Sequence, residues 1–399
     1  MTKPRGCQWA LSLGLTWFLV RFALIRGSAV QVDNVQMCHV VCRVESDAKR
    51  QEGDKKATRR RETMKILVTG GAGFLGARLS RTLLARGQLQ GRPIQKLVVT
   101  DQFAAPADLA SDARVEVRTG PLLSQCASVS QEHFDGVFHL ASAVSGECEL
   151  DFELGLRSNL DSTRALLDAL RATAAVSGGV VPRLVFSSSV AVFGPDPSAP
   201  LPAVVQDHTL PAPQTSYGTH KLICEHLVSD YTRKGFIDGR SARLMTVTVR
   251  PGRPNGAASS FFSGIIREPL AGEEAICPVS ADVSHPVSSP QRTVDGLIAV
   301  FEADREAFLG RLALNLPALN VTVAQMLEAL ERVAGPRVRQ RVKFVRDERI
   351  AGIVANWPQG ARGERALRLG LTPEAQFDDI IRQYIQDCAS HPSALKGLD

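Results

Sequence analysis

A tyrosine and a lysine four residues apart, Tyr217 and Lys221, are the residues whose spacing most clearly suggests chemistry. On a helix these two positions share a face, so the phenol and the ammonium would point into the same space. The nearby positive charge favours the phenolate, a general base able to take a proton from an alcohol while a hydride leaves its carbon. The same spacing is also common on solvated helix faces, so the pair alone is weak evidence.

A third polar group strengthens this interpretation. Ser189 ends the segment FSSS, which is typical of the end of a strand. Its hydroxyl could hydrogen-bond the oxygen of a substrate and hold it against the tyrosine. The alternative is a serine-rich strand end that satisfies local backbone groups. In combination, the three residues predict a site of alcohol dehydrogenation, which requires a hydride acceptor.

The hydride acceptor is indicated by Gly70, Gly73 and Gly76, which directly follow the apolar run 65–69. Glycines between a strand and a helix allow a tight turn and let the backbone approach a pyrophosphate. Asp101 ends the next apolar run, where a carboxylate can accept both ribose hydroxyls of an adenosine and repel a 2′-phosphate. A turn-forming aspartate is the alternative. The pattern therefore predicts NAD in preference to NADP.

The charge of the chain is concentrated at its start. Residues 1–63 hold 12 of the 47 Lys and Arg and 6 of the 41 Asp and Glu, which leaves the rest with 35 of each. The remainder has no excess charge for binding nucleic acid, so we expect no nucleic-acid partner. Residues 1–63 resemble a signal peptide, a presequence or an upstream extension that ends before Met64. We expect this leader to be disordered and dispensable for the chemistry.

The cysteines of the body are scattered along the chain. This distribution predicts reduced core thiols and a cytoplasmic protein, or an organellar or secretory one if the leader acts in targeting. The leader's apolar run is too short for a secure membrane span, so no stable membrane partner is expected. Cys38 and Cys42 have no second ligand pair at matching spacing, and no metal site is expected.

Apolar runs alternate with helix-compatible segments from Met64 onward, which predicts an α/β fold. We expect a doubly wound parallel sheet, or Rossmann domain, over 64–250. A smaller substrate-binding lobe over 251–399 would be partly interleaved with it. The expected strands are 65–69, 96–100, 114–118, 136–140, 183–187 and 243–249, and the clearest helices are 75–86, 159–171, 216–233, 293–303 and 322–334.

The motifs TGGAGFLG (69–76), SNLDST (158–163) and YGTHK (217–221) resemble those of extended short-chain dehydrogenases/reductases, a class that includes nucleotide-sugar epimerases. The resemblance implies that Tyr217 is the base and that Lys221 lowers its pKa and binds ribose. It also implies that Ser189 binds the substrate oxygen and that Asn159 positions a water and the lysine. The expected cofactor wall consists of Phe74, Leu75, Leu140, Ala141 and Ala143.

The second half, chiefly 249–279 and 315–335, resembles members of this class that oxidise four-carbon sugar acids with NAD at the 2-hydroxyl. A small anionic substrate requires cations or amides, and Arg can hold a carboxylate bidentately. The candidates are Arg253, Asn255, Arg267 and Arg292, although such a residue taken alone is more often a surface residue.

Two other functions remain open at this stage. One is a nucleotide-sugar epimerase or dehydratase that retains its NAD. The other is a non-catalytic NAD-sensing protein, which the intact catalytic residues disfavour. The family resemblance also suggests a homodimer formed through helices of the sheet domain.

Overall fold

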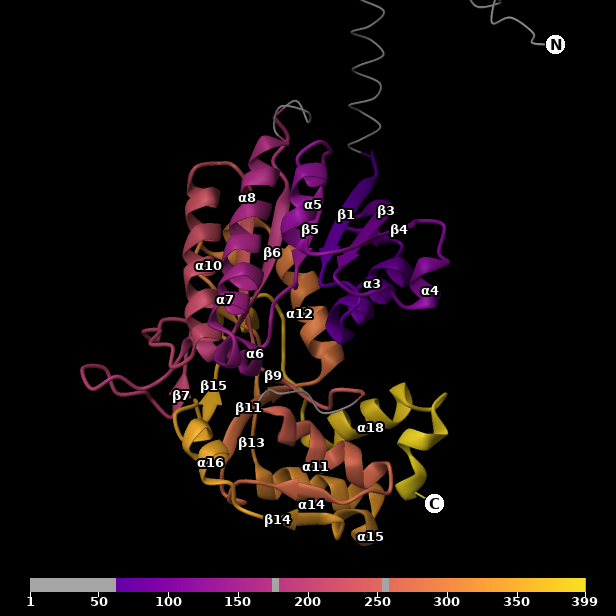
Figure 1. Ribbon diagram of the computed structural model, residues 1–399, viewed down its shortest axis with the longest axis vertical. Coiled ribbons are helices and arrows are strands. Elements are labelled where there is room, and N and C mark those ends of the chain that lie inside the picture. The colour runs from indigo at the N-terminus through magenta and orange to yellow at the C-terminus, as the bar shows by residue number, and fades with distance from the viewer. Residues whose placement is uncertain (1–61, 174–178, 253–257, 399) are drawn as a thin grey trace, which may run out of the picture. The chain divides into compact units, whose positions relative to one another are not determined.

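The computed structural model describes residues 62–173, 179–252 and 258–398, and within them the predicted α/β fold is confirmed (Figure 1). The main sheet has the order β12–β8–β6–β5–β1–β3, with β4 beside β3, and all of these pairs are parallel. The order reverses at β1, which is where doubly wound folds bind ligands. The strands are β1 (Met64–Thr69), β3 (Arg92–Asp101), β4 (Val115–Thr119), β5 (Gly136–His139), β6 (Arg183–Ser189), β8 (Asp238–Leu244) and β12 (Leu314–Asn315), and the short β2 (Gln88–Leu89) runs antiparallel to the start of β3.

Helices cover both faces of this sheet because its central strands are apolar on both sides. Ile66 and Val68 of β1 belong to one core, and Leu67 between them belongs to another. The first core is closed by α3 (Phe74–Arg86) and α12 (Pro290–Glu302). The second is closed by α5 (Leu122–Val129), α8 (Ser162–Ala172) and α10 (Ser216–Arg233), which stand together in Figure 1.

The C-terminal half of the chain builds a third core and also contributes to the main sheet. Its core involves α11 (Ser260–Leu270), α14 (Val323–Ala334) and α18 (Phe377–Asp387). Thr322 caps α14 by accepting from the backbone N–H of Gln325. Both α12 and β12 pack against the first half of the chain, so the two halves share structure. The proposed division at residue 250 stays a prediction.

One predicted strand is displaced. The sequence indicates a strand at 243–249, whereas β8 spans Asp238–Leu244 and β9 (Thr246–Val247) pairs with β11 (Ser284–Ser288) in a separate sheet that also contains β13 (Leu319–Thr322). The start of β8 does not look apolar because Arg240 lies there. This arginine is fully buried and donates to the carbonyl oxygens of Val300 and Phe301. Local hydrophobicity cannot reveal a strand whose buried charge is satisfied by distant groups.

The remaining short elements complete the C-terminal lobe and its link to the first half. The proline-rich segment before α10 contributes β7 (Val204–Val205), which pairs with β15 (Gly360–Ala361) near the C-terminus. The strands β10 (Ala275–Cys277) and β14 (Val342–Phe344) pair with each other. The predicted leader lies outside the described residues apart from Glu62 and Thr63.

Candidate active site

The glycine loop between β1 and α3 is tight enough to require its glycines. Gly70 has φ +70°, and a Cβ on it would lie 2.6 Å from the backbone N of Ala141. A Cβ on Gly76 would lie 2.1 Å from the carbonyl oxygen of Gly70. Gly73 precedes α3 and has no capping side chain, so the first N–H groups of the helix can serve an anion. The loop therefore fits the pyrophosphate of a dinucleotide.

Asp101 ends β3 beside this loop. Its carboxylate oxygens accept the backbone N–H of Ala72 at 3.0 Å and of Phe103 at 3.1 Å. These bonds fix the carboxylate at the cavity wall, and each oxygen keeps a further lone pair for a ribose hydroxyl. The next residues, Gln102 and Phe103, offer no cation for a 2′-phosphate. The position therefore fits NAD.

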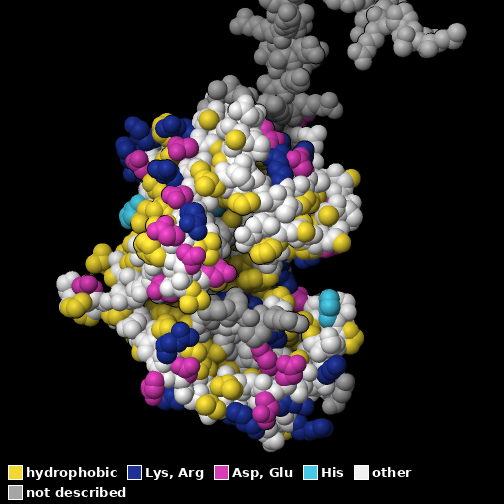
Figure 2. Space-filling model, in the orientation of Figure 1, with side chains coloured by type: hydrophobic (Ala, Val, Ile, Leu, Met, Phe, Trp, Pro, Cys, Tyr) yellow, Lys and Arg dark blue, Asp and Glu magenta, His cyan; other side chains and the backbone are white. Residues whose placement is uncertain are grey.

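A cavity of about 890 Å³ runs along the carboxyl edge of the sheet, large enough for a dinucleotide and a small substrate. Figure 2 shows the surface hollowed between the sheet domain and the C-terminal lobe. β9 contributes Thr246 to the wall, and the lobe contributes His285 and Trp357. The predicted residues that line the cavity are Gly70, Gly73, Phe74, Leu75, Gly76, Asp101, Leu140, Ala141, Ala143, Ser189, Tyr217 and Lys221.

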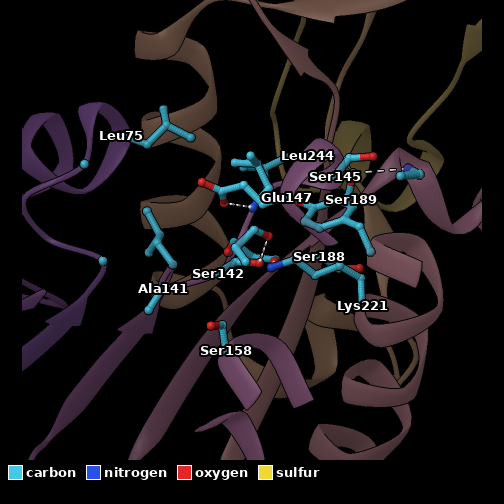
Figure 3. A pocket seen from close by; sticks show the side chains of 18 of the residues that line it. Leu75, Ala141, Ser142, Ser145, Glu147, Ser158, Ser188, Ser189, Lys221 and Leu244 are labelled. Atoms are coloured by element: carbon cyan, nitrogen blue, oxygen red, sulfur yellow. Dashed lines mark hydrogen bonds between the residues drawn. The ribbon is translucent and has the colours of Figure 1, made fainter. Parts of the chain in front are cut away.

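Three of the four catalytic candidates, Ser189, Tyr217 and Lys221, line this cavity. Thr215 caps α10 by accepting from the backbone N–H of Gly218, and the helix carries Tyr217 and Lys221. Lys221 Nζ lies 5.5 Å from the centroid of the tyrosine ring. Ser189 reaches the same space from the end of β6, and Figure 3 shows Ser189 and Lys221 across the pocket from Leu75.

The sequence predicts that nearby positive charge favours the phenolate of Tyr217, but in the structure the pKa of this tyrosine is raised. Burial raises the pKa of Tyr217, while hydrogen bonding with Ser189 and the charge of Arg250 act in the opposite direction. Burial also lowers the pKa of Lys221, to about 8. The loss of hydration on burial therefore raises the pKa of Tyr217 by more than the nearby positive charge lowers it. A cationic nicotinamide ring in the cavity would add positive charge, which stabilises the phenolate.

Asn159 does not line the cavity but holds part of its wall. Its amide oxygen accepts the backbone N–H of Ala143 at 2.7 Å and the hydroxyl of Ser142 at 3.0 Å. Its amide nitrogen donates to the carbonyl oxygen of Ala143 and to the sulfur of Cys148 in α6 (Ser145–Leu150). Asn159 lies in a π-helical stretch, η1 (Leu156–Asp161), a rare geometry that often occurs at functional sites. No local sequence pattern indicates this stretch.

Arg250 is a cavity residue that the sequence analysis missed. Its guanidinium donates to the carbonyl oxygen of Val247 at 3.0 Å and to the hydroxyl of Ser259 at 3.1 Å. Burial lowers its pKa, and proximity to Tyr217 acts to raise it. A largely buried cation thus lies beside the phenol in the same cavity. The signal available in the sequence was an arginine at the end of the apolar run 243–249.

The structure describes two of the four substrate candidates, and neither of these two lines the cavity. Arg253 and Asn255 lie outside the described residues. Arg267 is buried, and it donates to the carbonyl oxygen of Arg250 at 2.9 Å and pairs with Glu268. Arg292 is exposed, and neither it nor Arg267 lines the cavity. The positions of Arg267 and Arg292 therefore do not support direct contact with a substrate carboxylate.

The described part of the chain holds five cysteines, and all of them are free and buried. Within that part, no three His, Cys, Asp or Glu side chains gather in a way that could hold a metal ion. No helix in the same residues has both the length and the apolar character to cross a bilayer.

The fold, the glycine loop and the Ser–Tyr–Lys arrangement define an NAD-dependent oxidoreductase of the extended short-chain dehydrogenase/reductase type. The chain belongs to the NAD dependent epimerase/dehydratase family, whose sequence profile matches residues 66–284. It is 49% identical over 332 residues to D-erythronate dehydrogenase of Cupriavidus necator, a match that covers 81% of this chain and 98% of the relative. The D-erythronate dehydrogenase of Haemophilus influenzae is 40% identical, with 81% and 99% covered.

A solved structure shares the whole fold. The nucleoside-diphosphate-sugar epimerase from Agrobacterium tumefaciens is 42% identical and superposes with a TM-score of 0.77. The match covers 82% of this chain and 95% of that one. Relatives named for two different reactions are thus similar to this chain, and the choice between the reactions depends on the site.

Proposed function

We propose that this protein oxidises D-erythronate at its 2-hydroxyl to the 2-oxo acid and reduces NAD. The observation that carries the proposal is the guanidinium of Arg250 beside Tyr217 in the cavity. A 2-hydroxy acid places its carboxylate one bond from the carbon that is oxidised, so it needs a cation next to the base. Arg250 meets this need, and the names of the two relatives agree with it.

Each side chain of the site has a separate role in this reaction. Arg250 binds the carboxylate and thereby orients the 2-hydroxyl toward the phenol. Ser189 donates a hydrogen bond to the hydroxyl oxygen, and Tyr217 takes its proton as the carbonyl forms. The ammonium of Lys221 favours the phenolate form of Tyr217. Asn159 holds the cavity wall in place by accepting the backbone N–H of Ala143.

The cofactor residues are those of the glycine loop and of the strand ends beside it. The backbone at Gly70, Gly73 and Gly76 would hold the pyrophosphate, Asp101 the adenosine ribose, and Lys221 the nicotinamide ribose. Phe74, Leu75, Leu140, Ala141 and Ala143 would line the path of the cofactor. When bound, NAD supplies the acceptor for the hydride that leaves the carbon.

The second candidate is a nucleotide-sugar epimerase, which the relationship to the Agrobacterium protein favours. Such an enzyme uses the same tyrosine and lysine but must also accommodate a nucleoside diphosphate, and its NAD is not consumed. The placement of Arg250 next to the base argues for an acid. An NAD-sensing protein without activity would have no need for a buried tyrosine beside a buried lysine.

A substrate panel tests the proposal. We expect NADH absorbance to grow when the protein receives NAD with D-erythronate and to stay flat with UDP- or GDP-sugars. Tyr217→Phe should abolish this growth and leave NAD binding within about twofold, because the ring stays and only the hydroxyl is lost. Conversion of a nucleotide-sugar by protein that retains NAD would establish the epimerase instead.

The homodimer is a further proposal that rests on the family resemblance, and the cytoplasmic location is one that rests on the scattered cysteines. A mass measurement of the purified full chain by light scattering tests the first, with a monomer as the contradicting result. Microscopy of a tagged full-length chain tests the second and shows at the same time whether residues 1–63 direct it elsewhere.

A further inference from the structure

Glu225 is a buried carboxylate near the catalytic pair, and the mechanism above does not use it. Its side chain is 6% exposed, as is that of its partner Arg243. Glu225 follows Lys221 by one helical turn and Tyr217 by two, so the three side chains leave α10 on one face. Glu225 itself does not line the cavity. It can therefore influence the site only through its neighbours.

Both oxygens of this carboxylate are held by other elements. Arg243 of β8 donates Nε to Oε1 at 2.9 Å and Nη2 to Oε2 at 2.8 Å. Ser188 of β6 donates its hydroxyl to Oε1. The guanidinium of Arg243 lies 4.8 Å from the centroid of the Phe193 ring. A buried ion pair is seldom more stabilising than apolar residues of equal volume, so stability alone does not explain this one.

Two consecutive contacts tie this face of α10 to the end of β6. Lys221 Nζ donates to the carbonyl oxygen of Ser187 at 2.8 Å, and Glu225 accepts from the next residue, Ser188. Ser189 follows directly and lines the cavity. A shift of the strand end relative to the helix would therefore move the Ser189 hydroxyl away from the phenol. Small misplacements of this kind are costly for catalysis.

Glu225 also brings a negative charge close to Lys221. Burial lowers the pKa of the lysine, and Cys224, Cys148 and Glu225 act to raise it. Burial raises the pKa of both thiols, which keeps them neutral and leaves Glu225 as the anion of this group. The titratable and charged groups that face Lys221 are Cys148 of α6, His139 of β5, Tyr217, Cys224 and Glu225 of α10 and, through Glu225, Arg243 of β8.

We propose that Glu225 is a positioning residue of the active site, which holds the end of β6 against α10 through Ser188 and keeps a negative charge beside Lys221. The inference rests on the proposed function where turnover is measured. Glu225 thus has two effects that can be separated: its contact with Ser188 is geometric, and its charge beside Lys221 is electrostatic.

The variant Glu225→Gln separates them because it keeps the shape and an acceptor for Ser188 but removes the charge. The pKa of Lys221 should then fall, so the loss of kcat/KM for D-erythronate at high pH should begin about one pH unit lower. The double variant Glu225→Gln with Arg243→Gln also removes the opposing charge, and the profile should return toward that of the wild type. Glu225→Asp keeps the charge but shortens the side chain, so kcat should fall about tenfold with an unchanged profile.

The matched control is Glu328→Gln, which changes an exposed glutamate of α14 and should leave kcat and the pH profile unchanged. An unchanged profile in Glu225→Gln, or full kcat in Glu225→Asp, overturns the inference.

NADH binding, followed by fluorescence across the same pH range, is a second test that needs no substrate. In Glu225→Gln, NADH affinity should be lost at lower pH than in the wild type, and equal pH dependence contradicts the inference. A wild type without turnover on D-erythronate would instead refute the proposed function, and the NADH titration would still decide the role of Glu225.

Discussion

Replacing Arg250 by lysine tests whether this residue holds the substrate carboxylate. Lysine keeps the positive charge near Tyr217 but offers no planar fork for two parallel hydrogen bonds. A hydrogen bond to a charged group contributes about 1.5–3 kcal/mol, and the loss of one such bond corresponds to a decrease of about 10- to 150-fold in kcat/KM. We expect the decrease to appear mainly in KM for D-erythronate, because the tyrosine, serine and lysine are unchanged.

The assay is steady-state NADH formation with D-erythronate as the varied substrate, combined with NADH binding followed by fluorescence. Binding of NADH should change by less than about twofold, since Arg250 is assigned to the acid and not to the cofactor. Arg292→Lys is the matched control, because Arg292 is exposed and outside the cavity. An unchanged KM in Arg250→Lys, or an equal loss of NADH affinity, would refute the assignment.

Three further variants test other parts of the account. Gly76→Ala places a Cβ 2.1 Å from the carbonyl oxygen of Gly70 and should weaken NADH binding by more than about tenfold, whereas Gly352→Ala, in open space, should not. Asp101→Asn removes the charge that repels a 2′-phosphate, so KM for NADP should fall relative to KM for NAD. Thr322→Ala should lower the free energy of unfolding in urea by about 1 kcal/mol without affecting turnover, because it removes only a helix cap.

The placement of several predicted site residues follows from local sequence. The glycine spacing and Asp101 lie where a strand meets a turn, and Tyr217 and Lys221 lie one helical turn apart. The structure brings all of these residues to one cavity. Their common location was predictable because each motif consists of neighbours within a few residues along the chain.

The parts that depend on distant contacts were not predictable. Arg250 becomes a cavity residue only because the chain after β9 comes close to Tyr217 of α10. β8 was misplaced because its buried Arg240 is satisfied by carbonyl oxygens of α12, far along the chain. Glu225 looks like a helix-surface residue until Arg243 of β8 is seen to neutralise it. In each case a charged side chain is buried by partners that no local pattern identifies.

The central claim is that a hydride moves from carbon 2 of D-erythronate to NAD in the cavity that holds Tyr217. The most direct measurement supplies D-erythronate carrying deuterium at carbon 2 and determines the mass of the NADH that forms. We expect one deuterium in each NADH and a slower rate if hydride transfer limits turnover. NADH without deuterium, or acid returned with altered configuration while NAD remains oxidised, would contradict it.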